Sequence, residues 1–172
     1  RFRSRIIFKY QIDGDTALVQ DPCATFDDLS VQGKHNERNA SVALLAAVAI
    51  GADERRAREN ICTFRGLPHR LQCVRSGYYN DSKSTTPSAS KIAVDAFDDP
   101  TKIHLIVGGY DKHIDLTLLA EQSSRVACMY TIGATGNAIL QLASGNVQEC
   151  GTLEKSVSIA RSNMQSGDVL LM

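Results

Sequence analysis

The second half of the chain alternates between short apolar segments of strand length and longer amphipathic segments of helix length. The predicted strands are residues 103–107, 126–132, a short segment near Val147, and 169–172, and the predicted helices are 116–122, 137–143 and 153–163. Strands interleaved with helices form βαβ units, whose crossovers favour parallel strands. The sequence therefore predicts an α/β fold with a doubly wound, mostly parallel sheet.

The first third of the chain has a different pattern. Asp13-Gly14-Asp15 separates two β-prone runs at 6–10 and 16–20, which predicts a hairpin. An alanine-rich helix begins near Asn39 and stops at Gly51, and a second helix covers 53–62. The apolar face expected for the first helix comprises Val42, Leu45, Ala46 and Ala49.

A turn at Gly66-Leu67-Pro68 interrupts these patterns and predicts a domain boundary. After it, residues 71–74 and 78–80 are predicted to form a hairpin that leads directly into a helix over 89–97. Pro87 suits the first turn of that helix. Its candidate caps are three hydroxyl residues, Ser84, Thr85 and Thr86.

Ligands of doubly wound sheets bind outside the carboxyl ends of the strands, so residues just after strands are candidates for a site. Asp81, Lys83 and the three hydroxyls form a cluster at a helix start that suits a phosphate or a carboxylate. An ordinary helix cap with surface charges explains the same composition. In Gly108-Gly109-Tyr110-Asp111-Lys112 the glycines permit close approach and Lys112 could hold an acidic group, although turn glycines and a solvated lysine also fit.

Weaker signals surround these clusters. Gly133-x-x-Gly136 is only part of a dinucleotide fingerprint. Asn36 and Asn39 lie three residues apart, on one side of a helical turn, and Arg70 places a permanent charge just after the predicted boundary, where it would suit a triphosphate. His35 and His69 lack carboxylates at metal-ligand spacing, and the five cysteines contain no C-x-x-C, so no metal site and no disulfide framework is expected.

Charge and length restrict the partners. The 172 residues carry 19 Lys and Arg against 19 Asp and Glu, so no charge excess is available to hold nucleic acid or an anionic membrane. The longest apolar stretch, 42–50, is too short to span a bilayer. Because the chain starts at Arg1 and stops on the apolar run 169–172, we expect both ends to continue in a longer protein.

Four strings, taken together and in order, resemble the Mur ligase family, and within it the enzymes that add D-glutamate. The strings are Lys34-His35-Asn36-x-x-Asn39-Ala40, Phe64-Arg65-Gly66-Leu67-Pro68-His69-Arg70-Leu71, Asn80-Asp81-Ser82-Lys83-Ser84-Thr85 and Gly108-Gly109-Tyr110-Asp111-Lys112. The resemblance covers nearly the whole chain. It implies that residues 1–63 end a central ATP-binding domain and that 64–172 form most of a Rossmann-like, amino-acid-receiving domain.

The resemblance also implies a reaction and its residues. A cytoplasmic, monomeric, ATP-dependent acid–D-amino-acid ligase of peptidoglycan synthesis would join D-glutamate to UDP-N-acetylmuramoyl-L-alanine through an acyl phosphate. The residues expected at ATP are Asn36, Asn39, Arg70 and Asp81, and those expected at D-glutamate are Lys83, Thr85 and Lys112. No residue of the chain matches a family position that acts chemically on the reacting atoms.

Several family features are missing from the chain. It contains no G-x-x-x-x-G-K-[ST] phosphate loop, and the ligands for the family's Mg²⁺ would lie outside it. We therefore expect the 172 residues alone to lack ligase turnover. Two alternatives remain open: another Mur-type or folylpolyglutamate-type ligase, and a non-catalytic nucleotide-binding Rossmann domain that uses residues 133–137.

Overall fold

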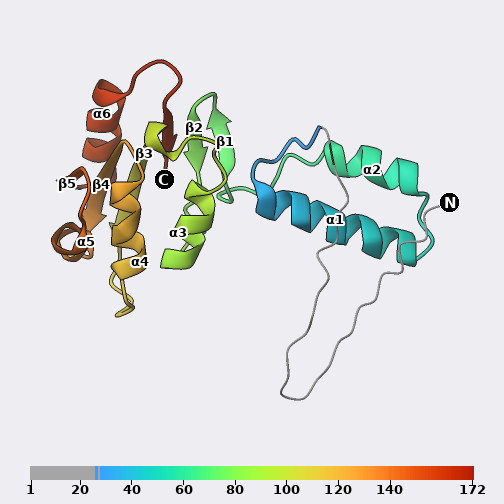
Figure 1. The fold of residues 1–172 in the computed structure, drawn as a ribbon, viewed down its shortest axis with the longest axis horizontal. Coiled ribbons are helices and arrows are strands. Elements are labelled where there is room, and N and C mark those ends of the chain that lie inside the picture. The colour runs from blue at the N-terminus through green and yellow to red at the C-terminus, as the bar shows by residue number, and fades with distance from the viewer. Residues whose placement is uncertain (1–25, 27) are drawn as a thin grey trace. The chain divides into compact units, whose positions relative to one another are not determined.

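The computed structural model of the chain describes residue 26 and residues 28–172 (Figure 1). These residues divide into two compact units, one that ends at Arg65 and one that comprises Gly66–Met172. The hairpin predicted around Asp13-Gly14-Asp15, with strands at 6–10 and 16–20, lies outside the described residues. The two units are therefore considered separately.

The first unit contains two helices, α1 (Lys34–Ala49) and α2 (Glu54–Cys62). The second begins where the sequence predicts, because the Asp53 carboxylate accepts a hydrogen bond from the Arg56 N–H at 2.9 Å and caps it. Helix α1 begins at Lys34, five residues before the predicted start at Asn39, directly after Gly33. Asn36 and Asn39 consequently lie within its first two turns.

The buried face of α1 differs from the predicted one. Its buried residues are Ala40, Ser41 and Leu44, whereas Val42 is 41% exposed. The expected face of Val42, Leu45, Ala46 and Ala49 is therefore wrong. Residues 42–50 are apolar around the whole helix, so periodicity offers little contrast between faces, and tertiary contacts select the side that is covered.

The second unit is built on a six-stranded sheet. Its strands are β1 (Gln72–Arg75), β2 (Tyr78–Asn80), β3 (Ile103–Gly109), β4 (Cys128–Gly133), β5 (Val147–Gly151) and β6 (Val169–Leu171). Their order is β1-β2-β6-β3-β4-β5, and every neighbouring pair except the β1–β2 hairpin is parallel. The prediction of a doubly wound, mostly parallel sheet is confirmed. The last strand lies between the second and third, so β3 occupies the middle of the parallel part.

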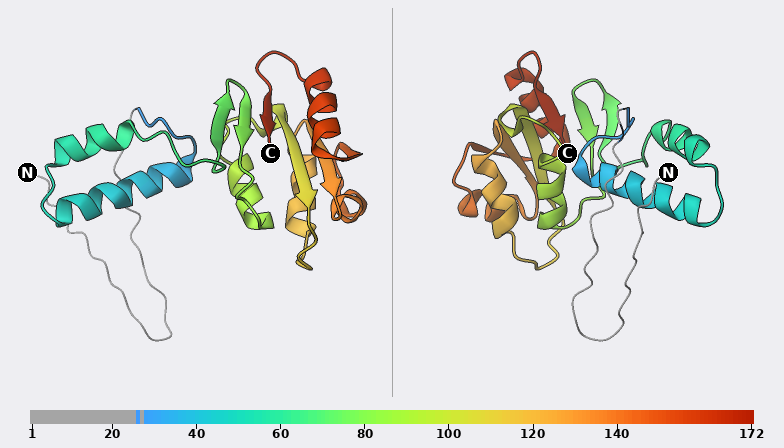
Figure 2. Two further views of the ribbon diagram at one scale, coloured as in Figure 1. Left: turned by 180° about the vertical axis from the view of Figure 1, so that it is seen from behind. Right: turned by 45° about the vertical axis from the view of Figure 1, so that its right-hand side comes forward.

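Helices cover both faces of this sheet (Figure 2). The helices are α3 (Pro87–Val94), α4 (Thr117–Ala120), α5 (Gly136–Leu142) and α6 (Leu153–Asn163), with short 3-10 turns at Pro100–Lys102 (η1) and Glu121–Ser124 (η2). Helix α6 has the predicted bounds. The helix predicted over 116–122 is only one α-helical turn that tightens into η2, where the Gln122 amide donates to the Leu118 carbonyl at 2.9 Å.

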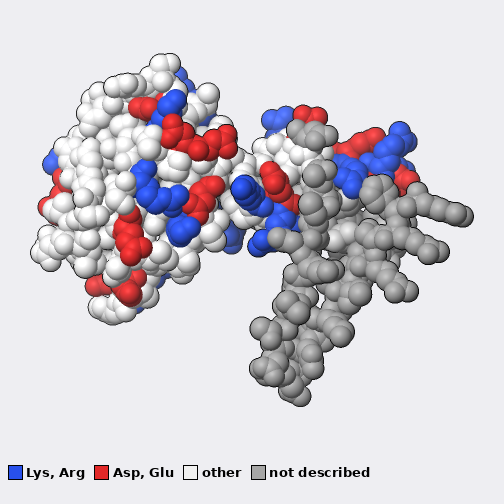
Figure 3. All heavy atoms as spheres, viewed as in Figure 1, with Lys and Arg blue, Asp and Glu red and all other residues white. Residues whose placement is uncertain are grey.

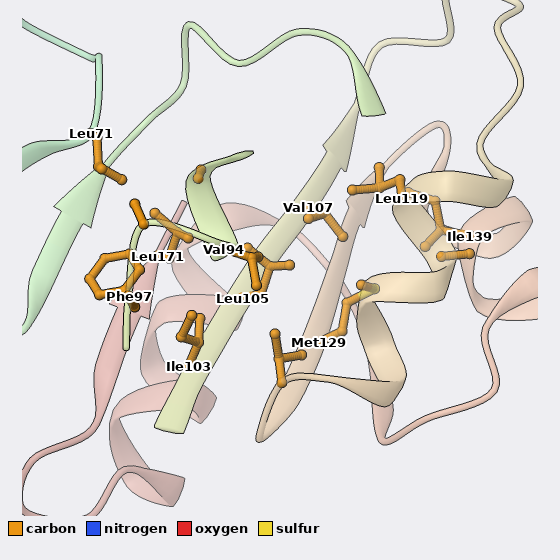
Figure 4. Close-up of a cluster of buried hydrophobic side chains, with 14 residues drawn as sticks. Leu71, Val94, Phe97, Ile103, Leu105, Val107, Leu119, Met129, Ile139 and Leu171 are labelled. Carbon is orange, nitrogen blue, oxygen red and sulfur yellow. The ribbon is translucent and has the colours of Figure 1, made fainter. Parts of the chain in front are cut away.

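Strand β3 supplies alternate residues to two cores. Ile103, Leu105 and Val107 face α3, α4 and α5 together with Leu171 of β6 (Figure 4), whereas Ile106 faces the side covered by α6. This alternation follows from the two-residue period of a strand. Burial of each large apolar side chain contributes about 1.5–3 kcal/mol. Because β3 is buried on both faces, its carboxyl end is held rigidly at the centre of the unit.

A hydrogen-bonded chain of polar groups crosses the α6 side of the sheet. The Asn163 amide donates to the Tyr130 hydroxyl at 3.2 Å, the Tyr130 hydroxyl and His104 Nδ1 share a hydrogen bond at 2.9 Å, and His104 Nε2 lies 3.2 Å from an Asp168 carboxylate oxygen. Burial raises the pKa of Tyr130 to about 12, so its hydroxyl stays protonated at neutral pH. These bonds satisfy the buried His104 and fasten the end of α6 to β3 and β4.

We predict that Asp95→Asn weakens the second unit in a pH-dependent way. Asp95, at the end of α3, accepts from Lys91 at 2.5 Å and Arg125 at 2.6 Å. Partial burial raises the Asp95 pKa, but hydrogen bonds and charge from these two cations outweigh it and leave the pKa below its ordinary value. Solvent screens the pair, so the loss in unfolding free energy at pH 7 should stay below about 1 kcal/mol.

The direction of this pH dependence follows from the lowered pKa of Asp95 in the folded state. The ion pairs stabilise the fold above the unfolded-state pKa of about 3.9, and their contribution is lost as the pH falls through the folded-state value. Denaturant titrations at pH 7 and below pH 3 measure the difference. It should vanish at low pH, and a pH-independent difference would contradict the prediction. Asp98→Asn, at an exposed neighbouring position, is the control.

Candidate amino-acid site at the carboxyl ends of the strands

A cavity of about 550 Å³ opens at the carboxyl ends of β3, β4 and β6, beside the start of α3. Its apolar floor includes Leu105, Val107, Ile132 and Leu171, and its polar lining includes Asp81, Thr85, Thr86, Ser90, Lys112 and Thr135. The cavity lies at the edge of the sheet where ligands of doubly wound folds bind. Its size and mixture of groups suit a small polar molecule.

Glycines at the ends of β3 and β4 let these strands meet closely beneath the cavity. A Cβ at Gly108 would lie 2.1 Å from the Ile132 carbonyl oxygen, and one at Gly133 would lie 2.7 Å from the Gly109 Cα. Gly108 also has a φ of 116° and Gly133 a φ of 66°. Gly108 and Gly109 belong to β3 itself rather than following it. Packing between strands thus explains Gly108 and Gly133 without a bound phosphate.

Asp81 organises the entrance to α3. One carboxylate oxygen accepts the Leu71 N–H at 2.8 Å, and the other accepts the Ser84 hydroxyl. Thr86 is the N-cap of α3 and accepts the Ala89 N–H at 3.3 Å, one of the three caps expected from the sequence. With Ser84 and Thr86 engaged in this way, the Thr85 hydroxyl makes no hydrogen bond within the described residues and lines the cavity.

The cavity gathers three of the residues expected from the sequence, Asp81, Thr85 and Lys112. Lys83 and Arg70 are exposed and are not among its lining residues. Asn36 and Asn39 lie in the other unit, and the Asn36 amide donates to the Gln32 carbonyl at 2.8 Å. The assignments of all seven residues to ATP or D-glutamate remain predictions. The described residues contain no cluster of three or more His, Cys, Asp or Glu able to hold a metal ion.

Sequence reasoning missed several polar residues of the lining, including Ser90, Tyr110 and Thr135. Tyr110 is 86% exposed at the rim, and Thr135 is 6% exposed at the end of β4. Tyr110 and Thr135 belong to the candidate segments 108–112 and 133–137, in which the glycines and Lys112 are the more prominent signals. The available signal was the position of each residue just after a central parallel strand.

The surface outside the cavity carries both signs of charge, and Figure 3 shows acidic and basic side chains interspersed on the face in view of each unit. Among the described residues, no helix combines the length and apolar character required to cross a bilayer.

Comparison with known proteins identifies relatives along most of the chain. The chain is 37% identical over 180 residues to the UDP-N-acetylmuramoylalanine–D-glutamate ligase of Aquifex aeolicus. This match covers 99% of the chain and 43% of the relative. The chain is 34% identical over 174 residues to the ligase of the same name from Acidobacterium capsulatum, which covers 97% and 36%. The chain therefore spans about two-fifths of the length of these curated relatives. No protein-family profile matches it.

Solved structures share the fold at lower identity. A pseudomurein peptide ligase type C from Methanothermus fervidus matches with a TM-score of 0.68 and 16% identity, over 83% of the chain and 33% of that protein. A UDP-N-acetylmuramate-alanine ligase from Thermotoga maritima matches with a TM-score of 0.62 and 16% identity, over 83% and 34%. These matches confirm a Rossmann-like α/β fold. The sequence matches show that nearly the whole chain is similar to D-glutamate ligases of the Mur ligase family.

Proposed function

We propose that the chain is part of an ATP-dependent ligase that adds D-glutamate to UDP-N-acetylmuramoyl-L-alanine during peptidoglycan precursor synthesis. In this proposal the unit Gly66–Met172 receives the amino acid. The observation that carries the proposal is that Thr85, from the start of α3, and Lys112, from the loop after β3, line one cavity. The sequence relatives support D-glutamate as the amino acid.

The cavity offers chemistry that suits a dicarboxylic amino acid. D-Glutamate carries two carboxylates, which are best held by an ammonium group and hydroxyl donors. Lys112 supplies the charge, and Thr85 supplies a hydroxyl that the fold leaves free of hydrogen bonds. A ligand held in this way directs its amino group toward an acyl phosphate. The amine nitrogen forms the amide bond as phosphate leaves with the bonding electrons and the nitrogen loses a proton, so the unit contributes positioning.

The ATP assignments rest on different observations. The Arg70 side chain is exposed, makes no hydrogen bond or ion pair within the described residues, and offers a planar fork that fits phosphate oxygens. Asp81 fits less directly, since both its oxygens already accept hydrogen bonds from the chain. We assign Asn36 and Asn39 of α1 to the nucleotide by resemblance. The proposal also includes Mg²⁺ held by residues outside the chain, a cytoplasmic location and a monomeric state.

The test of the proposal is Lys112→Ala in the complete ligase that contains this segment. Removal of the ammonium should raise the KM for D-glutamate about tenfold or more, because a hydrogen bond to a charged group contributes about 1.5–3 kcal/mol. The KM for ATP should change much less. Steady-state kinetics with each substrate varied in turn measures both constants.

A matched control is Lys102→Ala. Lys102 is also an exposed lysine, but it belongs to η1, just before the amino end of β3 and therefore at the opposite edge of the sheet. This variant should keep the KM values of the parent. An unchanged KM for D-glutamate in the Lys112 variant would remove the assignment of the cavity to the amino acid.

A further inference from the structure

Thr135 occupies an unusual position at the end of β4. It is 6% exposed and lines the cavity, and its N–H donates to the Gly109 carbonyl at 3.2 Å. It is the N-cap residue of α5, yet its side chain does not cap that helix. Within the described residues the Thr135 hydroxyl makes no hydrogen bond. The backbone is therefore fixed to the end of β3, while the hydroxyl borders the cavity without a partner in the described chain.

The Thr135 hydroxyl is not enclosed by the fold, so water can reach it in the unliganded cavity. Thr131, on β4, also has a hydroxyl without a partner, but its oxygen is buried and Thr131 does not line the cavity. Thr135 differs because a molecule in the cavity could accept its proton. This contrast separates a hydroxyl available to a ligand from one enclosed by the fold.

The order of the strands sets where Thr135 lies relative to the other donors. Thr85 follows β2, Lys112 follows β3 and Thr135 follows β4, in a sheet where β6 separates β2 from β3. Adjacent strands are about 4.8 Å apart, so the ends of β3 and β4 are one spacing apart and those of β2 and β4 about 14 Å. Lys112 therefore comes from a strand between those that precede the two threonines. A ligand that contacts Thr85 and Lys112 therefore needs a second polar group to form a hydrogen bond with Thr135 as well.

We propose that Thr135 is a specificity-determining residue that donates a hydrogen bond to the carboxylate of the amino acid farther from Thr85. The inference rests on the proposed function, since it requires a dicarboxylic amino acid in the cavity. It adds a third donor, from β4, to the two expected from the sequence. In this arrangement Thr135 favours amino acids with two carboxylates over those with one.

The test compares Thr135→Val, Thr135→Ser and Thr131→Val in the 172-residue chain, with Lys112→Ala as the reference for the proposed function. Calorimetric titration with D-glutamate measures affinity, and thermal unfolding measures stability. Thr135→Val should weaken D-glutamate binding about tenfold, because a hydrogen bond to a carboxylate is lost. Thr135→Ser keeps the donor and should stay within about threefold of the parent, as a serine hydroxyl has the same donor capacity.

Stability separates this role from a structural one. Valine replaces an unpartnered hydroxyl with a methyl group of similar shape, so neither valine variant should lower the melting temperature. Thr131→Val should also leave D-glutamate affinity unchanged. If Lys112→Ala weakens binding and Thr135→Val does not, the inference fails while the proposed function stands. If the parent chain does not bind D-glutamate, or Lys112→Ala has no effect, the proposed function fails and the inference fails with it.

Discussion

Gly108→Ala should destabilise the second unit by about 4 kcal/mol and should lower its melting temperature by about 15 °C or more. Two costs combine at this position. The added Cβ would lie 2.1 Å from the Ile132 carbonyl oxygen, so β3 and β4 would have to separate at their paired ends. The φ of 116° is also one that L side chains rarely adopt. Thermal and denaturant unfolding of the parent and the variant measure the loss.

Gly109→Ala provides a matched control for the steric part of this effect. Gly109 is the next residue of β3 and has a φ of 132°, but an added Cβ there would meet nothing within 4 Å. Only the backbone strain remains, at about 1–2 kcal/mol. Equal losses in the two variants would show that the close approach of β3 and β4 is not what requires glycine at residue 108.

Asp81→Ala should cost the second unit about 3 kcal/mol, because a buried carboxylate that accepts two hydrogen bonds is removed. The Leu71 N–H, which donates to it at 2.8 Å, would be left without its partner in a residue that is only 9% exposed. Leu71 also has a φ of 44°, and the bond to Asp81 helps to hold this strained conformation. Denaturant unfolding monitored by circular dichroism measures the change.

The control for this variant is Asp115→Ala. Asp115 also accepts a backbone N–H, that of Thr117 at 2.9 Å, but its carboxylate is exposed, so water replaces the lost acceptor. The effect should be much smaller than at Asp81. A loss at Asp81 no larger than at Asp115 would argue against a structural role for the buried carboxylate. It would leave the predicted contact with ATP as the reason for an aspartate at this position.

These two positions connect the stability of the unit to its cavity. Gly108 fixes the floor where β3 and β4 end, and Asp81 fixes the entrance to α3, next to Thr85. Lys112 and Thr85 therefore hold their places through contacts that are made several residues away. A substitution at either position should impair both folding and ligand binding, whereas Lys112→Ala should affect binding alone.

Several elements could be predicted because their signals are local. The hairpin of β1 and β2, the cap at Thr86 and the bounds of α6 follow from turn residues, capping side chains and apolar periodicity within a few positions. The buried face of α1 could not be predicted, since its apolar run offers several equivalent faces. The helix at Thr117–Ala120 is shorter than the predicted 116–122, because the chain tightens into η2 after Ala120.

Some features of the candidate site could likewise be predicted from local sequence, and others could not. The sequence by itself determined the parallel α/β class, the cluster from Asn80 to Thr86 and the lysine after β3, because each depends on neighbouring residues. Only the tertiary structure decided that β6 enters between β2 and β3, that Asp81 is tied to Leu71, and that the Thr135 hydroxyl borders the cavity without a partner in the described chain. These features depend on contacts between residues far apart in the chain. Local propensity and periodicity do not predict such contacts, so these features become visible only in the folded structure.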